Sequence, residues 1–210
     1  MCDGGYTPWD GSSYIAMVGL DGVGKTSLCL QALGSDANPR PTGMEDCMKT
    51  NTMSPMRLNE WSLLVRKTYV QILDLGGQPQ HYVAWPKRYA NVLCMMIVID
   101  ASSLARWGEF VFVYKKVIQS HLLSARIPAV FVLNKQDRVV SGTAAVTPEI
   151  LKEALGLEDP ITRPDHFDIC KCSAFMQESV RHAFSVAVQL LAECKRMNNT
   201  AIRREIKVGE

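Results

Sequence analysis

A glycine-rich stretch near the start of the chain has the spacing that phosphate binding requires. Residues 19–26 read GLDGVGKT and fit the pattern G-x-x-x-x-G-K-[S/T] at every fixed position. The glycines allow a turn whose N–H groups surround phosphate oxygens, Lys25 can reach the β- and γ-phosphates, and the hydroxyl of Thr26 can bind Mg²⁺. We therefore expect a nucleoside-phosphate site made of Asp21, Gly22, Val23, Gly24, Lys25, Thr26 and Ser27.

A second group of candidate residues closes the apolar run YVQIL in the stretch DLGGQ, residues 74–78. Asp74 stands where a strand should end, and its carboxylate can hold Mg²⁺ through a water molecule. The N–H of Gly77 can meet a γ-phosphate, and the amide of Gln78 can orient an attacking water. The alternative for Gln78 is an exposed loop side chain without a role, but its place in the motif favours the catalytic interpretation.

A third group predicts which base is bound. Residues 134–137 read NKQD after the strand-like run VFVL, so Asn134 and Lys135 stand beside Asp137. A carboxylate here can accept hydrogen bonds from N1–H and the 2-amino group of guanine, whereas adenine would leave it unpaired. The backbone N–H groups of Ser173 and Ala174 can meet the guanine O6. The motif therefore predicts GTP and GDP as ligands and argues against an ATP-dependent kinase.

The hydrophobic pattern predicts the elements that must position these residues. Apolar runs indicate strands, and 3.6-residue periodicity with capping residues indicates helices. All the motifs fall at carboxyl ends of strands, where open α/β sheets bind ligands. The order β-α-β-β-α-β-α-β-α-β-α predicts an α/β, three-layer P-loop NTPase fold with a six-stranded, mostly parallel sheet and about five helices. The expected strands are residues 13–18, 63–65, 68–73, 92–99, 130–133 and 167–172, and the expected helices are 26–33, 79–90, 103–123, 147–156 and 177–196.

Composition limits the remaining classes of function. The 210 residues suit one domain, 47% of them are hydrophobic, and the net charge of +2 does not indicate a nucleic-acid partner. No apolar run is long enough to span a bilayer. Seven scattered cysteines, an odd number, are best interpreted as reduced thiols in a cytosolic protein. We expect a cytoplasmic monomer with peripheral membrane contact at most.

Taken together, the motifs resemble those of the Ras superfamily of small GTPases, and within it the ADP-ribosylation-factor (Arf) and Arf-like family. The residues Leu20-Asp21, Gly76-Gly77-Gln78 and Gln136 are Arf-like choices, and the resemblance covers about residues 14–194. It implies a molecular switch that binds GTP or GDP with Mg²⁺ and hydrolyses GTP slowly, with a GAP supplying an arginine. It also implies exchange factors and effectors at the switch regions, and a role in membrane traffic or in ciliary or cytoskeletal processes.

The resemblance implies a further Mg²⁺ ligand in switch I, a threonine that binds the metal in the GTP state. Thr42, in the stretch PTGM, lies close to the family's spacing after Lys25, but Thr50 and Thr52 are rivals. The distance from Thr42 to Asp74 exceeds that of a typical Arf, so we expect an insertion around residues 45–59. These departures motivate an alternative function, a GTP-binding scaffold with little or no hydrolysis, against which Gln78 argues.

The two ends of the chain also depart from the family pattern. Residues 1–11 contain three glycines and a proline, and Cys2 follows Met1, so we expect a flexible N-terminus without an amphipathic helix or a myristoylated glycine. Residues 12–196 are expected to form the G domain, and residues 197–210 a basic C-terminal tail.

An aromatic group in the expected switch II segment allows two interpretations. Tyr82, Trp85 and Tyr89 can form a surface for effectors, as the resemblance implies, or they can pack on the sheet. The sequence leaves both open.

Overall fold

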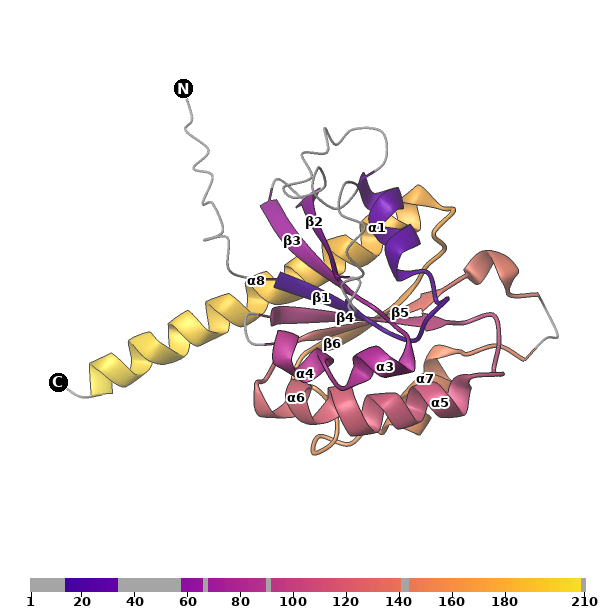
Figure 1. Cartoon of the computed structure of the whole chain (residues 1–210). Coiled ribbons are helices and arrows are strands. Elements are labelled where there is room, and N and C mark those ends of the chain that lie inside the picture. Colours follow the sequence, from indigo (N-terminus) through magenta and orange to yellow (C-terminus); the bar gives the residue numbers. More distant parts are fainter. Residues whose placement is uncertain (1–13, 34–57, 66–67, 90–91, 141–143, 209–210) are drawn as a thin grey trace, which may run out of the picture.

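A six-stranded sheet forms the centre of the molecule, with helices on both of its faces (Figure 1). The computed structural model describes residues 14–33, 58–65, 68–89, 92–140 and 144–208. The strand order is β2-β3-β1-β4-β5-β6. The strands are β1 (Tyr14–Val18), β2 (Leu58–Val65), β3 (Thr68–Leu75), β4 (Val92–Asp100), β5 (Ala129–Asn134) and β6 (Phe167–Lys171).

The sheet brings the predicted site residues to one edge. β2 runs antiparallel to β3, and all other neighbouring pairs are parallel. Met17 is paired with Asp74, and Asp100 is paired with Asn134, so the carboxyl ends of β1, β3, β4 and β5 meet at the same edge. β4 and β5 are buried along almost their whole length, as expected for central parallel strands that are covered on both faces.

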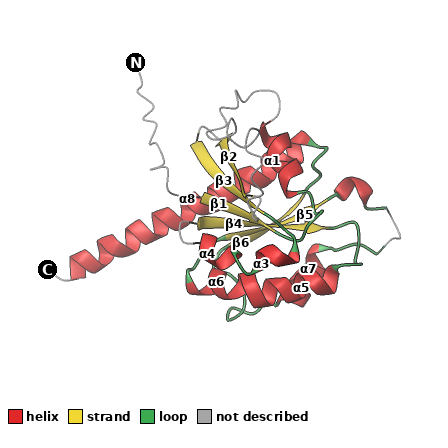
Figure 2. Cartoon of the chain, viewed as in Figure 1, coloured by secondary structure: helices red, strands yellow, loops and turns green. Residues whose placement is uncertain are grey.

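The helices divide between the two faces of the sheet (Figures 1 and 2). α1 and α8 lie together on one face, and the remaining helices lie on the other. A π-helical turn, Tyr114–Ile118, joins α5 to α6, so these three segments form one continuous helical stretch. The helices are α1 (Lys25–Leu33), α3 (Pro79–Tyr82), α4 (Trp85–Arg88), α5 (Trp107–Val113), α6 (Gln119–Ser124), α7 (Pro148–Leu155) and α8 (Gln177–Val208).

The predicted fold class is confirmed, and the expected strands at residues 63–65 and 68–73 lie within β2 and β3, which pair antiparallel. Helix α7 also begins and ends where the sequence predicts. The hydroxyl oxygen of Thr147 accepts a hydrogen bond from the N–H of Ile150 at 3.4 Å, and Gly156 ends the helix in the left-handed conformation with φ 67°. Capping residues therefore located these boundaries correctly.

The helix expected from residue 103 begins later, at Trp107. Ser102 donates its hydroxyl to Asp100 Oδ1 at 2.6 Å, and the Ser103 hydroxyl accepts from the N–H of Ala105 at 3.1 Å. Both serines thus stabilise the turn between β4 and α5 instead of capping the helix, because short polar side chains favour local turns as readily as caps.

Helix α8 is longer than the predicted helix, which ended at Arg196. It continues to Val208 and extends away from the sheet (Figure 1). The apolar face that marks the helix in the sequence ends near Leu191, but no glycine or proline follows until Gly209. The helix therefore continues to the residue before that glycine. No helix within the described ranges, α8 included, is both long and apolar enough to cross a membrane.

Candidate functional site

The glycine-rich loop connects β1 to α1 and curls over the first turn of that helix. Gly22 and Gly24 have φ values of 72° and 97°, a backbone conformation that residues with a side chain rarely adopt. A Cβ on Gly24 would also lie 2.5 Å from Asn134 Nδ2, so the loop packs closely against the end of β5. Gly24, a fixed position of the pattern, is therefore required both by its backbone conformation and by the space available, whereas Gly22 is required by its conformation alone.

Lys25 is held inside this loop. Its Nζ donates to the carbonyl oxygens of Gly19 at 2.9 Å and Leu20 at 2.8 Å, and only 7% of the residue is exposed. Burial lowers the pKa of Lys25 to about 8, against the opposing effect of Asp74 and Asp21. An ammonium group in this place is suited to bind phosphate oxygens, which would replace the weaker carbonyl partners.

Thr26 and Asp74 supply two oxygen atoms side by side. The Thr26 hydroxyl donates to Asp74 Oδ2 at 2.6 Å, and Asp74, at the end of β3, is 3% exposed. A hydroxyl and a carboxylate are the hard oxygen ligands that Mg²⁺ prefers, and the residues present therefore fit this ion. Ser27 is exposed in the first turn of α1. Thr42 and its rivals Thr50 and Thr52 lie outside the described residues.

Gly77 lies against the glycine-rich loop, and Gln78 follows it at the start of α3. A Cβ on Gly77 would overlap the backbone of Leu20 and Asp21, so only glycine fits there. Gln78 is exposed, and its Oε1 accepts a hydrogen bond from Gln80 Nε2 at 3.0 Å. The structure thus places the predicted water-orienting amide beside the loop, at the protein surface.

Asn134 joins the glycine-rich loop to the predicted base site. Its side chain is fully buried; Nδ2 donates to the carbonyl oxygen of Val23 at 2.8 Å, and Oδ1 accepts from the N–H of Ala174 at 3.2 Å. The two loops that should hold the phosphates and the base are therefore connected through one amide group.

Asp137 and Lys135 are the charged residues of the base motif. Asp137 Oδ1 accepts from the hydroxyl of Ser173 at 2.5 Å, and Lys135, in the left-handed conformation with φ 65°, places Nζ 2.5 Å from Asp100 Oδ2. Burial raises the pKa of Asp100, but hydrogen bonds from Lys135 and Ser102 outweigh that effect and lower it. Asp100 is thus a member of the site that sequence reasoning missed, although it ends the apolar run of β4.

The N–H groups that were expected to meet guanine O6 already donate within the protein. The N–H of Ser173 donates to Ser179 Oγ at 3.0 Å, and that of Ala174 donates to Asn134. Their contact with the base stays a prediction.

The aromatic group of the 79–89 segment does not form a partner surface as a unit. Trp85 and Tyr89 are 2% and 1% exposed, Trp85 Nε1 donates to the carbonyl oxygen of Gly76 at 3.0 Å, and the Tyr89 ring lies 4.6 Å from that of His121. The partner-surface interpretation is wrong for these two residues, because the short helices α3 and α4 turn their large rings inward. Tyr82 is half-buried, and Val83 is 83% exposed.

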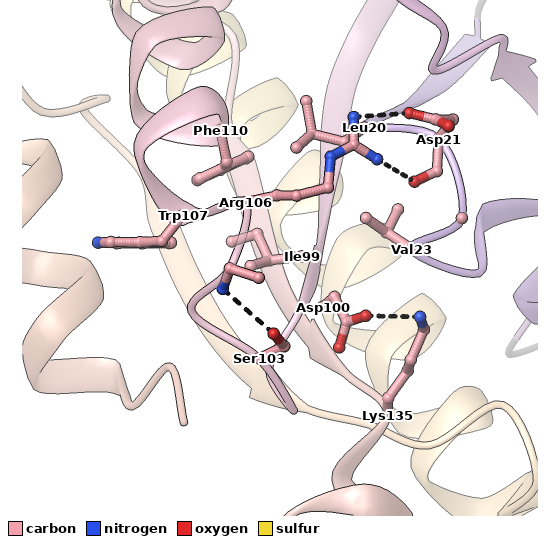
Figure 3. A pocket seen from close by; sticks show the side chains of 12 residues that line it. Leu20, Asp21, Val23, Ile99, Asp100, Ser103, Arg106, Trp107, Phe110 and Lys135 are labelled. Carbon is pink, nitrogen blue, oxygen red and sulfur yellow. Dashed lines mark hydrogen bonds and ion pairs between the residues drawn. The ribbon is translucent and has the colours of Figure 1, made fainter. Parts of the chain in front are cut away.

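Sequence reasoning also missed Arg106, which precedes α5 and lies against the glycine-rich loop. Its Nη2 is 2.8 Å from Asp21 Oδ1, and its Nη1 donates to the Asp21 carbonyl oxygen at 3.2 Å (Figure 3). A cavity of about 260 Å³ lies beneath this pair, lined by the loop, the end of β4 and the apolar side chains of Trp107 and Phe110. No sequence motif could have paired residues so far apart.

The sheet order, the glycine-rich loop between β1 and α1, and the Asn134–Asp137 motif at the end of β5 define the class of P-loop guanine-nucleotide-binding proteins. The model of the ADP-ribosylation factor family matches residues 7–191. The chain therefore belongs to the ADP-ribosylation factor family of small GTPases, and it is a nucleotide-binding switch that hydrolyses GTP.

Individual relatives support this assignment. The chain is 28% identical over 179 residues to ADP-ribosylation factor-like protein 2 of Arabidopsis thaliana, covering 85% of this chain and 86% of the relative. It is 30% identical over 175 residues to human ADP-ribosylation factor-related protein 1, covering 83% of each. The Arl6 (BBS3) small GTPase of Trypanosoma brucei, solved with the bound nucleotide analogue GppNp, shares the fold with a TM-score of 0.62 and 21% identity, over 86% of this chain and 98% of its own.

Proposed function

We propose that this chain alternates between GTP-bound and GDP-bound states with Mg²⁺ held by Thr26 and, through water, by Asp74. The observation that carries the proposal is the pair of oxygen atoms 2.6 Å apart beside the buried ammonium of Lys25. When bound, Mg²⁺ would supply positive charge against the negative charge of the phosphates. Thr26 and Asp74 would hold and orient the ion. Lys25 adds a fixed positive group inside the glycine-rich loop.

The roles of the other residues follow from their places. Asp137 accepts the guanine hydrogen bonds, and Ser173 and Arg138, whose Nε lies 3.9 Å from Asp137 Oδ2, fix the orientation of its carboxylate. Asn134 keeps the phosphate loop and the base loop in register. Gln78, beside Gly77, orients the attacking water. Hydrolysis is slow in isolation and is accelerated by a GAP that adds an arginine.

We further propose that exchange factors and effectors contact the switch segments. Because Trp85 and Tyr89 are buried, the accessible part of the second segment is formed by its other side chains, with Tyr82 half-buried. The exposed residues are Gln78, Pro79, Gln80, Val83, Pro86, Lys87 and Arg88. In this proposal the protein is cytoplasmic with peripheral membrane contact at most, and it regulates membrane traffic or ciliary or cytoskeletal processes. Recovery of partners on immobilised protein, loaded with a GTP analogue or with GDP, tests the dependence of these contacts on nucleotide.

Nucleotide binding by the purified full chain tests the proposed chemistry. We expect tight binding of GTP and GDP in the presence of Mg²⁺, much faster release after chelation, and ATP binding weaker by at least about a thousandfold, because adenine leaves Asp137 unpaired. Equal affinity for ATP, or release that does not respond to chelation, would contradict the proposal. A scaffold without hydrolysis would bind GTP in the same way but would not convert it to GDP.

A further inference from the structure

Arg106 has a set of contacts that nothing in the nucleotide motifs accounts for. It binds Asp21 twice, once at the carboxylate and once at the main-chain carbonyl oxygen (Figure 3). It also forms two bonds with Glu109, from Nε to Oε2 at 2.7 Å and from Nη2 to Oε1 at 2.8 Å. All three nitrogens of the guanidinium group are therefore engaged, and its orientation is fixed on both sides.

The bond from Arg106 to the Asp21 carbonyl oxygen lies at the part of the phosphate loop against which Gly77 packs. The Asp21 carbonyl oxygen that Arg106 binds belongs to the Asp21–Gly22 peptide, and Gly77 packs against the preceding Leu20–Asp21 peptide without room for a Cβ. Arg106 thus holds the peptide that directly follows the one against which Gly77 packs, and Gly77 is the residue whose N–H is expected at the γ-phosphate. A main-chain contact of this kind acts on the direction of the loop's N–H groups, which an ordinary exposed ion pair does not do.

Arg106 also compensates the negative charge of the Asp21 carboxylate. The Asp21 carboxylate lies on a loop that must receive three phosphates, and the bond from Arg106 is the largest effect holding the pKa of that carboxyl below its usual range. Asp21 is therefore ionised at neutral pH. Without Arg106, an uncompensated negative charge would stand beside the phosphates, and a triphosphate would be disfavoured more than a diphosphate.

Glu109 extends the contact towards α3. Its Oε1 accepts from the Tyr82 hydroxyl at 3.5 Å, and the Tyr82 ring packs on Trp85 with centroids 4.9 Å apart. Trp85 in turn binds the carbonyl oxygen of Gly76. A continuous series of contacts therefore runs from the phosphate loop through Arg106 to the segment that carries Gln78.

We infer that Arg106 is a positioning residue for the nucleotide's γ-phosphate end: it neutralises Asp21 and fixes the Asp21 carbonyl oxygen, next to the Leu20–Asp21 peptide against which Gly77 packs. The inference rests on the proposed function, because it concerns selectivity between GTP and GDP at that site. It assigns Arg106 no contact with the nucleotide, and its effect passes through Asp21.

The test compares affinities for GDP and for GppNp, a GTP analogue that is not hydrolysed, in the full chain with Mg²⁺. We expect Arg106→Gln to lower the affinity for GppNp relative to GDP by roughly fivefold or more. Asp21→Asn in the same molecule should restore part of the wild-type ratio, because the uncompensated charge is gone while the main-chain bond from Arg106 is still absent. Arg126→Gln is the matched control, since Arg126 makes an exposed ion pair with Asp165 at 3.8 Å, and it should leave the ratio unchanged.

Arg106→Lys is the second variant in case Arg106→Gln does not fold. It keeps a positive charge beside Asp21 but loses the forked contacts, and we expect its GppNp to GDP ratio to fall less than that of Arg106→Gln. An unchanged ratio in Arg106→Gln, a loss in Arg106→Lys as large as in Arg106→Gln, or no restoration by Asp21→Asn would overturn the inference. Failure of the wild-type protein to bind GTP at all would instead reject the proposed function.

Discussion

At the scale of single residues, the site depends on groups whose charge or hydrogen bonding is set by burial. Lys25 is an example, because the loop removes its ammonium from water and offers it two carbonyl oxygens in exchange. Bound phosphates would stabilise the charged form far more strongly than carbonyl oxygens do. The pKa of Lys25 should therefore rise when nucleotide binds, and binding should be linked to a proton.

This linkage gives a pH dependence with a definite sign. Below pH 8 the Lys25 amine is already protonated in the free protein, so GDP affinity should not depend on this group. Above pH 8 the free amine has lost its proton and binding must restore it, so affinity should fall by up to about tenfold per pH unit. Calorimetry in buffers of different ionisation enthalpy should detect proton uptake at pH 8.5 and almost none at pH 7. Proton release at pH 8.5 would contradict this account of Lys25.

Asp137 carries the choice of base, and its substitution should change that choice. In Asp137→Asn an amide N–H replaces one carboxylate acceptor, so it should pair with the 2-carbonyl of xanthine and no longer with the 2-amino group of guanine. We expect GTP affinity to fall by at least about a hundredfold, since charge-assisted hydrogen bonds contribute ~1.5–3 kcal/mol each, and affinity for xanthosine triphosphate to rise. Competition of both nucleotides against labelled GDP measures the change. GTP affinity equal to that of the wild type would contradict the assignment of Asp137 to the base site.

At the scale of elements, the important feature is how closely the β3–α3 connection packs on the phosphate loop. Gly77→Ala places a methyl group on the Leu20–Asp21 backbone, which must shift to make room. We expect GTP hydrolysis and the preference for GTP analogues over GDP to fall by about tenfold or more, because the Gly77 N–H would move away from the γ-phosphate.

Gly108 in α5 provides the matched control for this substitution. A Cβ there would meet nothing within 4 Å, and alanine favours a helix over glycine by up to about 1 kcal/mol. Gly108→Ala should therefore leave hydrolysis unchanged and raise the melting temperature slightly. If Gly77→Ala behaved like Gly108→Ala, the close packing of Gly77 would have no functional importance.

Motifs within one turn, such as residues 19–26 or the Thr147 cap, could be predicted because local spacing determines their geometry. The burial of Trp85 and Tyr89 could not, because aromatic residues in two short helices have no clear periodicity to show which face is covered. The start of α5 was missed because serines in a turn and serines at a cap look alike in a sequence.

At the scale of the whole molecule, the site is formed by five parallel strands whose carboxyl ends meet, and by loops from distant parts of the chain. The order of motifs predicted this edge of the sheet correctly. It could not predict Arg106, which meets Asp21 across 85 residues of sequence through the packing of α5 beside the loop. Contacts of that kind depend on how whole elements are placed, so only the assembled fold reveals them.

The most direct test of the central claim is single-turnover hydrolysis by wild type and Gln78→Leu, each loaded with GTP and supplied with Mg²⁺ but with no excess nucleotide. Gln78→Leu keeps the size of the side chain but cannot orient a water molecule, and the exposed Gln78 side chain gives up only its hydrogen bond from Gln80 Nε2. We predict GTP and GDP binding within about twofold of wild type and hydrolysis slower by about tenfold or more, with a loss of ~10²-fold when a cognate GAP is present. Equal hydrolysis by the two proteins, or no conversion of GTP to GDP by wild type, would contradict a switch that hydrolyses GTP through Gln78.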